Sequence, residues 1–321
     1  TWYFAEGYTG QGFDEWICVL NPGGTPADLT FSFQTQEEGE KVVTGFAVAP
    51  HSRASFRAND LLGGAYQNSL ALRSTQPVVA ERPMYFSYSG TGGWGWTGGH
   101  CVMGASILAT DYYFAEGTTR GGFEEWLTIQ NPGPVLIDVH ATYMLETGET
   151  KEMDYPVSPA QRSTIFVPSE VGAGQDVSVY LSCPDPFFAE RPIYFDYMGT
   201  GGWGWTGGHC VIGAIESSTE WLFAEGYTGG GFEEWLCIQN PGASEAEVTV
   251  VYYPEAGDPI TKNHTIPGGS RYTVFVNTDA GPDLTISTEV TSSQPVICER
   301  PMYFSYSGAW TGGHNDMGYV P

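Results

Sequence analysis

The sequence contains the stretch Phe4-Ala-Glu-Gly-Tyr-Thr-Gly-Gln-Gly-Phe-Asp-Glu-Trp16, which returns with few changes at Phe114–Trp126 and at Phe223–Trp235. A second stretch, Glu81-Arg-Pro-Met-Tyr-Phe86, returns at Glu190–Phe195 and at Glu299–Phe304. Successive copies lie 109 or 110 residues apart. This period is too long for a solenoid unit of about 20–50 residues and is typical of a whole domain. We therefore predict three tandem domains, at residues 1–109, 110–218 and 219–321.

Within each copy, apolar and polar residues alternate in short runs that end at Gly, Pro or Asn. In the first copy Leu29, Phe31 and Phe33 would share one face of a half-buried strand. The expected strands of this copy are residues 2–6, 15–20, 29–33, 41–49, 53–57, 69–74, 78–88 and 100–105. No run has the 3.6-residue period of a helix. The pattern predicts an all-β chain of three immunoglobulin-like antiparallel β-sandwiches with seven or eight strands each.

The chain is strongly acidic, with a formal net charge of −25 and only 12 Lys and Arg residues. Such a surface repels the phosphates of nucleic acids and anionic membranes, so we expect neither as a partner. No apolar run approaches the roughly 20 residues that a membrane-spanning helix needs, so we expect no membrane insertion. Since the first repeat begins at Thr1, we expect a mature secreted chain or a segment of a longer array.

Each copy holds two cysteines, which suggests an oxidising compartment. The simplest expectation is one disulfide per domain, although free buried thiols or bridges between neighbours remain open. The expected pairs are Cys18–Cys101, Cys183–Cys210 and Cys237–Cys298.

Six arginines occupy two repeated positions, at 53, 162 and 271 and at 82, 191 and 300. In so acidic a chain, arginines at the same position of every repeat predict carboxylate partners. The planar guanidinium can hold a carboxylate with two hydrogen bonds. We expect structural ion pairs within each repeat. The partners of Arg82, Arg191 and Arg300 would be Glu6, Glu116 and Glu225, or else Glu15, Glu125 and Glu234.

The sequence lacks the motifs of common catalytic, metal and phosphate sites, such as Gly-x-Ser-x-Gly and His-Glu-x-x-His. Neighbouring acidic residues such as Glu124 and Glu125 would point to opposite faces of a strand and could not bracket one glycosidic bond. We therefore expect no enzyme activity, no cofactor and no metal site.

A glycine-rich loop with tryptophans is the strongest candidate for a binding surface. It runs from Thr91 to His100, returns from Thr200 to His209, and is shortened to Gly308–His314 in the third copy. Its tryptophans could cap their own domain, contact a neighbouring domain or subunit, or stack on a sugar, and its histidines would anchor the loop. The candidate residues are Trp94, Trp96, His100, Trp203, Trp205, His209, Trp310 and His314.

The ordered motifs Phe-Ala-Glu-Gly, Gly-Phe-Glu-Glu-Trp, Asn-Pro-Gly, Glu-Arg-Pro and Gly-Gly-His resemble those of a bacterial secreted repeat. That family consists of β-sandwich modules found in tandem on surface and exported proteins. The resemblance covers all three copies and implies an extracellular or cell-surface, non-catalytic protein. The segment Gly92–Trp96 departs from the family pattern.

Together these features favour an extracellular structural protein that forms a head-to-tail homopolymer in a filament, sheath or surface layer. The alternative is an adhesion or carbohydrate-binding module that holds a cell-surface polysaccharide. With seven strands per domain, the tryptophan loop would face the preceding repeat, and Trp94 and Trp96 would contact the third repeat of another subunit. With eight strands, the loop would share a pole with the glycine-rich turn of its own domain and would cap it or bind laterally.

Overall fold

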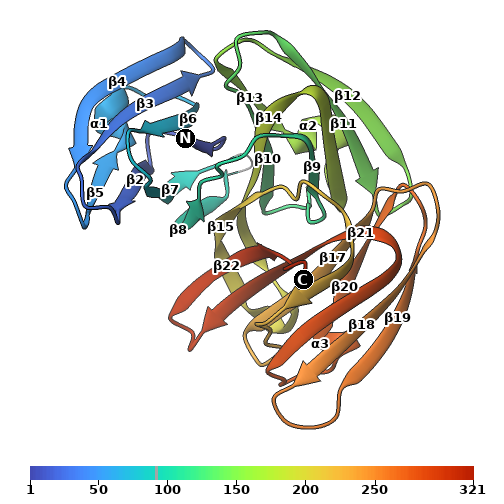
Figure 1. The fold of residues 1–321 in the computed structure, drawn as a ribbon. Coiled ribbons are helices and arrows are strands. Elements are labelled where there is room, and N and C mark those ends of the chain that lie inside the picture. The colour runs from blue at the N-terminus through green and yellow to red at the C-terminus, as the bar shows by residue number, and fades with distance from the viewer. Residues whose placement is uncertain (91–92) are drawn as a thin grey trace.

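The computed structural model describes residues 1–90 and 93–321 and is built almost entirely of antiparallel strands (Figure 1). We call residues 1–109, 110–218 and 219–321 repeats 1, 2 and 3. The prediction of an all-β chain of immunoglobulin-like sandwiches is confirmed. None of the helices in the described part of the chain has the length and hydropathy of a membrane-spanning segment.

The described residues of repeat 1 supply eight strands in two sheets, with the orders β1-β6-β3-β4 and β5-β2-β7-β8. The expected ranges overlap all eight. Their bounds are β1 (Trp2–Phe4), β2 (Phe13–Asn21), β3 (Ala27–Thr35), β4 (Gly39–Val48), β5 (Ser52–Arg57), β6 (Asn68–Ser74), β7 (Val79–Ser89) and β8 (Gly95–Met103).

Repeats 2 and 3 have the same topology, except that one long strand runs through both sheets. Residues 177–182 of β14 pair with β11, whereas residues 188–198 pair with β10 or β15. In repeat 1 the segment with Gln76 and Pro77 separates the equivalent strands β6 and β7. The bounds in repeat 2 are β9 (Ala109–Phe114), β10 (Phe123–Asn131), β11 (Ile137–Leu145), β12 (Thr150–Val157), β13 (Gln161–Phe166), β14 (Val177–Met198) and β15 (Gly204–Ile212). Those in repeat 3 are β16 (Ser218–Phe223), β17 (Phe232–Asn240), β18 (Ala246–Pro254), β19 (Ile260–Ile266), β20 (Ser270–Phe275), β21 (Ile286–Tyr306) and β22 (Trp310–Met317).

The period-two pattern places the expected side chains in the cores. Leu29, Phe31 and Phe33 of β3 are buried in the core of repeat 1. Each repeat has its own hydrophobic cluster, but Ala5 joins the cluster of repeat 2 and Ala115 joins that of repeat 3. The Phe-Ala-Glu-Gly motif therefore contributes to the core of the following repeat.

The helices are single turns that follow the fifth strand of each repeat. They are α1 (Ala58–Leu62), α2 (Val167–Val171) and α3 (Val276–Asp279), and a 3₁₀ turn, η2 (Thr200–Gly202), lies in repeat 2. They are shorter than two helical turns, as the absence of a 3.6-residue period predicts.

The Asn-Pro-Gly motif is explained by a buried asparagine side chain at the start of an exposed turn. The Asn21 side-chain amide donates to the carbonyls of Thr25, Val48 and Ala49, and its oxygen accepts from the Gly23 amide. Asn131 and Asn240 make the same four bonds. The asparagine thus satisfies backbone groups that the turn leaves without strand partners.

The strand count decides where the tryptophan loop lies. The Ser87 amide donates to the Gly12 carbonyl, and the equivalent bonds join Asp196 to Gly122 and Ser305 to Gly231. The hairpin that carries the tryptophans therefore shares a pole with the glycine-rich turn of its own repeat. The seven-strand placement, with the loop facing the preceding repeat, was wrong.

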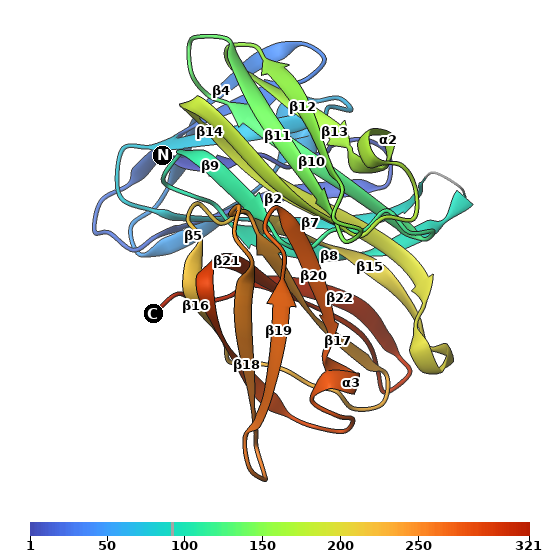
Figure 2. The ribbon, with the colours of Figure 1, turned by 90° about the vertical axis from the view of Figure 1, so that its right-hand side faces the viewer.

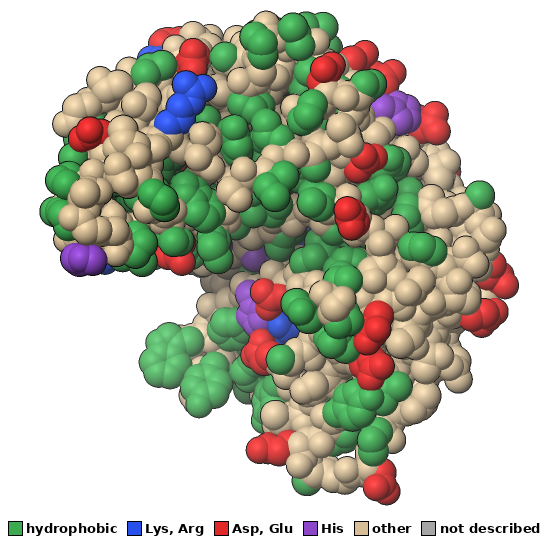
Figure 3. All heavy atoms as spheres, viewed as in Figure 1, with side chains coloured by type: hydrophobic (Ala, Val, Ile, Leu, Met, Phe, Trp, Pro, Cys, Tyr) green, Lys and Arg blue, Asp and Glu red, His purple; other side chains and the backbone are tan. Residues whose placement is uncertain are grey.

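The three repeats follow one another around an arc, and β8, β15 and β22 lie side by side near its centre (Figure 1 and Figure 2). The connectors, residues 104–108 and 213–217, are short. A notch separates the N-terminal repeat from the C-terminal one on the open side of the arc (Figure 3).

Candidate functional site

Two surfaces meet wherever one repeat packs on the next. The first is the end of a sandwich where the Phe-Ala-Glu-Gly turn meets the Glu-Arg-Pro strand, and we call it the acceptor pole. The second is the outer side of the following sheet, and we call it the outer face. The acceptor pole consists of Glu6, Gly7, Arg82 and His100 in repeat 1, of Glu116, Gly117, Arg191 and His209 in repeat 2, and of Glu225, Gly226, Arg300 and His314 in repeat 3. The outer face is marked by Arg53, Glu81 and Tyr85 in repeat 1, by Arg162, Glu190 and Tyr194 in repeat 2, and by Arg271, Glu299 and Tyr303 in repeat 3.

At the first junction, Arg82 and Glu190 form a fully buried ion pair of 2.8 Å. The Glu190 carboxylate also accepts the Glu6 amide at 2.6 Å. In the opposite direction, Arg162 donates to the Gly7 carbonyl at 2.8 Å and lies 3.4 Å from the Glu6 carboxylate. Charges from both repeats therefore interlock, and each arginine has a carboxylate partner in the other repeat.

The second junction repeats the arginine contacts to the carboxylate and the glycine carbonyl of the neighbouring repeat, although the accepted backbone amide and the partner of the pole glutamate differ. Arg191 pairs with Glu299 at 2.8 Å and with Glu116 at 2.6 Å, and all three side chains are buried. The Glu299 carboxylate accepts the Ala115 amide at 2.7 Å. Arg271 donates to the Gly117 carbonyl at 2.7 Å. Two junctions with matching partners indicate one specific mode of packing.

The electrostatics of the poles follow from burial and these pairs. Burial opposes ionisation of Glu116, but His209 and Arg191 outweigh it and lower its pKa to about 2. Burial lowers the pKa of Arg82, whereas the nearby Glu190, Cys210 and Glu6 raise it. The net effect is a raised pKa. Glu116 and Arg82 are therefore held in the charged form.

A second set of repeated carboxyls is held differently. Burial raises the pKa of Glu15 and of Glu234 to about 7, and it raises that of Glu125 well above the usual range. Glu15 accepts a hydrogen bond from Asn68 at 2.8 Å. In the part of the chain that the structure describes, these three glutamates form no ion pair with the repeated arginines, so they are not the carboxylate partners that those arginines require.

The structure places only some of the expected ion pairs within a repeat. Arg191 meets Glu116, and Arg300 meets Glu225 at 3.2 Å. Arg82 bonds only the backbone carbonyl of Glu6, and its carboxylate partner is Glu190 in the next repeat. Glu190 and Glu299 were missed because the expectation was confined to partners within one repeat.

The tryptophans divide into two groups. Trp96 and Trp205 are each 1% exposed and pack on Tyr88 and Tyr197 of their own hairpins. Trp205 also donates to the carbonyl of Gly231 in the following repeat at 3.4 Å. Trp96 belongs to the cluster at the first junction. Both side chains are buried within the molecule. Trp96 therefore cannot make the expected contact with another subunit.

The remaining tryptophans are more open. Trp94 and Trp203 are 41% and 40% exposed, and Trp310, the equivalent of Trp96 and Trp205, is 66% exposed. Residues 91 and 92 of the first loop lie outside the described residues. Trp310 stacks on Tyr306 at the hairpin of repeat 3.

The Gly-Gly-His motif explains how closely the repeats approach. A Cβ atom added to Gly98 would lie 3.2 Å from the Gly207 Cα, and one added to Gly207 would lie 3.3 Å from the Gly312 Cα. The strands β8, β15 and β22 can therefore pack on one another only because these positions lack side chains.

The histidines after these glycines face the poles. Burial, Arg82 and His209 lower the pKa of His100 well below its usual range. His209 Nε2 lies 3.6 Å from a Glu116 oxygen. In repeat 3, ligand atoms of Glu225, His314 and Asp316 lie within 4.8 Å of one another, but Arg300 is bound to both carboxylates there and already supplies a positive charge.

All six cysteines lie in the described part of the chain, and all are free thiols. The prediction of one disulfide per domain was therefore wrong. Cys18 and Cys101 share a face but are two strands apart, about 9.5 Å, which exceeds the reach of a disulfide. Cys298 lies opposite Ile238, so its side chain points away from that of Cys237.

The pair in repeat 2 is separated as well. Cys183 lies in the core of that repeat. The Cys210 sulfur lies 3.5 Å from Arg82 of repeat 1 and therefore faces the first junction.

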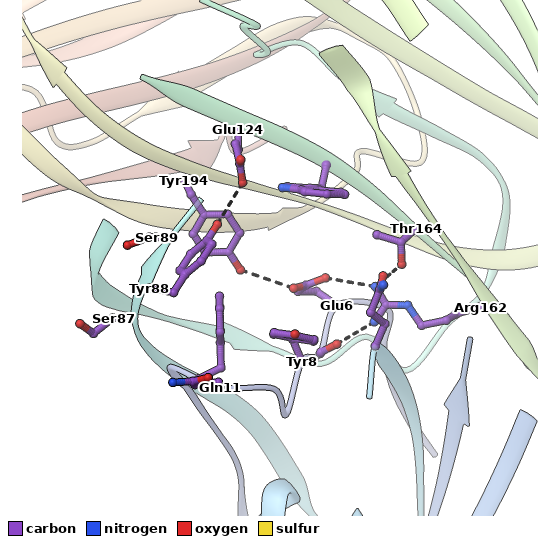
Figure 4. A pocket seen from close by; sticks show the side chains of 14 residues that line it. Glu6, Tyr8, Gln11, Ser87, Tyr88, Ser89, Glu124, Arg162, Thr164 and Tyr194 are labelled. Carbon is purple, nitrogen blue, oxygen red and sulfur yellow. Dashed lines mark hydrogen bonds and ion pairs between the residues drawn. The ribbon is translucent and has the colours of Figure 1, made fainter. Parts of the chain in front are cut away.

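A cleft opens beside each junction. The first has a volume of about 670 Å³ and the second about 550 Å³. In the first, Glu6 lies between Tyr194 and Arg162, and the Tyr88 hydroxyl points toward Glu124 (Figure 4). Equivalent residues line both clefts, including Trp126 and Trp235, Glu124 and Glu233, and Arg162 and Arg271.

No protein-family model matches the chain, and no curated protein matches it. Solved structures with local similarity include the Thermotoga maritima protein 1070, which is 19% identical over 33% of this chain and 96% of its own, with a TM-score of 0.31. The Anabaena sensory rhodopsin transducer is 27% identical over 26% of this chain and 95% of its own, with a TM-score of 0.24. The tandem CBM22 domains of Paenibacillus barcinonensis Xyn10C are 15% identical over 56% of this chain and 76% of their own, with a TM-score of 0.18. These TM-scores are too low to indicate a function for this chain.

Proposed function

We propose that the protein is an extracellular, non-catalytic structural protein whose three domains form one stiff building block of a filament, sheath or surface layer. The observation that carries this proposal is the repeated junction, in which the same buried charges interlock twice. Breaking such a junction would leave charges buried without partners, which costs several kcal/mol. The repeats therefore act as one curved body rather than as beads on flexible linkers.

The location outside the cell rests on the resemblance to secreted bacterial repeats and on the acidic surface. A net charge of −25 keeps such a protein soluble and away from anionic membranes and nucleic acids. Its self-repulsion also requires that any assembly contact be specific, since charge alone would keep copies apart.

Electron microscopy of the native secreted material tests this function. Regular filaments or sheets that react with an antibody against the chain would support it. Native material that consists only of single molecules retained on a polysaccharide column would contradict it.

The two clefts favour a second function, binding of a polysaccharide. Each combines a tryptophan wall with a carboxylate and an arginine, and flat aromatic rings stack on sugar rings while charged groups bond hydroxyls. Titration with a panel of bacterial polysaccharides would measure this binding. Binding lost in Trp126→Ala/Trp235→Ala but kept in Trp310→Ala, whose tryptophan lies outside the clefts, would support it. Binding that is equal in both variants would exclude the clefts.

A further inference from the structure

In the described part of the chain, the outer face of repeat 1 is covered by neither repeat 2 nor repeat 3. Arg53, Glu81 and Tyr85 occupy the same strand positions as the outer-face residues of repeats 2 and 3. Arg53 and Glu81 are exposed, and Tyr85 is 57% exposed. Their equivalents Arg162, Glu190 and Tyr194 are at most 4% exposed, because repeat 1 covers them. The face thus has the chemistry of a junction without its partner.

Repeat 3 carries the complementary half. Arg300 has the position of Arg82 and Arg191, and the Glu225 side chain is 63% exposed. The Gly226 carbonyl accepts a backbone amide from Ile286, just as the Gly117 carbonyl accepts one from Val177 while also binding an arginine of the next repeat. A group of basic, acidic and histidine side chains lines the repeat 3 side of the notch (Figure 3).

We infer that the outer face of repeat 1 binds the acceptor pole of repeat 3 in a second copy of this chain, in the geometry of the two internal junctions. This inference rests on the proposed structural function and identifies its contact. Arg53 would donate to the Gly226 carbonyl, Glu81 would pair with Arg300, and Tyr85 would donate to Glu225. These are the roles that Arg271, Glu299 and Tyr303 have at the second junction.

The aromatic surfaces also match. At the first junction Tyr88 packs against Tyr194 with its hydroxyl on Glu124. Tyr306, the equivalent of Tyr88, is 55% exposed in repeat 3. The equivalent place on repeat 1 is a hollow of about 410 Å³ lined by Asp14, Arg57 and Tyr85. The Tyr306 ring of one copy would fill the hollow of another.

Apolar side chains surround the charged positions of the free outer face. Leu20, Val79 and Met103 are 46%, 37% and 56% exposed and are neighbours on β2, β7 and β8. An apolar patch around a few charged groups is typical of a protein interface, whose centre gains from losing water.

One residue of the pole opposes this contact. Asp316 stands where repeats 1 and 2 have Val102 and Val211, and it pairs with Arg300 at 2.7 Å. Asp316 already forms an ion pair with the Arg300 guanidinium that Glu81 of another copy would bind. It therefore competes with Glu81 for Arg300. We therefore expect association between copies to be weaker than an internal junction and to strengthen when Asp316 is removed.

Sedimentation velocity of the purified full chain over a range of concentrations, at about 0.15 M salt to screen net repulsion, tests the contact. Wild type should associate in steps of one chain. Asp316→Val should strengthen this association roughly tenfold, as expected for loss of one competing ion pair. Glu81→Ala/Tyr85→Ala should stay monomeric, whereas Glu152→Ala/Tyr253→Ala, which removes the same exposed residue types from other strands, should behave as wild type.

A mixing experiment tests the polarity. Arg300→Gln removes the cation of the pole and Glu81→Ala/Tyr85→Ala disables the outer face, so each should be monomeric alone. Their mixture should form one-to-one dimers and no larger species, because each dimer has two disabled ends. Circular dichroism establishes that all variants are folded.

The outcomes separate this contact from the proposed function. Association of Glu81→Ala/Tyr85→Ala at the wild-type level, or wild type and Asp316→Val both monomeric, would overturn the contact. Filaments in the native material would in either case leave the structural function standing. Rings and open filaments would both agree with the contact, because the rotation between copies alone decides between them.

Discussion

The guanidinium of Arg82 lies 2.8 Å from the carboxylate of Glu190, which stands 108 residues further along the chain, almost one repeat away. Arg191 and Glu299 have the same separation in sequence and the same distance. Each arginine therefore pairs with the glutamate of the Glu-Arg-Pro motif in the next repeat, and not with the glutamate of its own motif. A motif that looks local, Glu-Arg-Pro, is in fact divided between two junctions.

Arg191→Met should lower the free energy of unfolding by about 3–5 kcal/mol, because Glu116 and Glu299 would both stay buried without their cation. Urea unfolding followed by fluorescence measures this. Arg73→Met, the same change at an exposed position, should cost less than about 0.5 kcal/mol. Equal stability of the two variants would contradict a stabilising role for the junction.

Stability should be greatest near pH 4.5. Glu15 and Glu234, with pKa values of about 7, bind protons more tightly when folded, so stability falls as the pH rises from about 4.5 through 7. Each shift corresponds to about 3 kcal/mol. Glu116, with a pKa of about 2, contributes stability above about pH 4.5 that is lost as the pH falls through 2.

Urea midpoints from pH 3 to 8 measure this profile. Glu15→Gln keeps the shape of the side chain but removes its charge, so it should flatten the decline between pH 4.5 and 7. A variant whose profile matches that of wild type would show that Glu15 ionises normally.

Alkylation should distinguish the thiols. Cys101 is exposed and Cys18 is half-buried, whereas the other four cysteines are buried. Burial raises the pKa of Cys210, Cys237 and Cys298, and the thiolate is the reactive form. Iodoacetamide should therefore label only Cys18 and Cys101 in the folded protein and all six after unfolding. A disulfide-linked peptide in unreduced digests would refute the free thiols.

Gly207→Ala should destabilise the chain by about 1–3 kcal/mol, because its Cβ would lie 2.8 Å from the Phe195 ring and 3.3 Å from the Gly312 Cα. Gly204→Ala, on the same strand, meets nothing closer than the Met198 Cε at 3.8 Å and serves as the control. Thermal unfolding compares them, and equal midpoints would mean that β15 and β22 can move apart without cost.

Much of the fold followed from the sequence because strands leave a local signal. Period-two alternation identified β3, and the Gly and Pro positions separated the strands of the first copy. The sequence left seven or eight strands per domain open. In repeat 1 the segment with Gln76 and Pro77 divides β6 from β7, whereas the equivalent strands in repeats 2 and 3 are continuous.

The junctions were not predicted, because a repeated pair of residues cannot tell a contact within one repeat from a contact shifted by one repeat. A signal was nonetheless present. Glu81 and Arg82 are neighbours on a strand and must point to opposite faces, so two separate surfaces require charged partners. Only a stack of repeats supplies both.

The interlocked junctions also give the arc a mechanical character. A pull on the two ends of the chain would load Arg82 and Glu190, and Arg191 and Glu299, together with the short connectors at residues 104–108 and 213–217. The molecule would resist extension, because the two junctions must separate before any strand is pulled out of a sheet. Tensile strength in such a molecule resides between its repeats as much as within them.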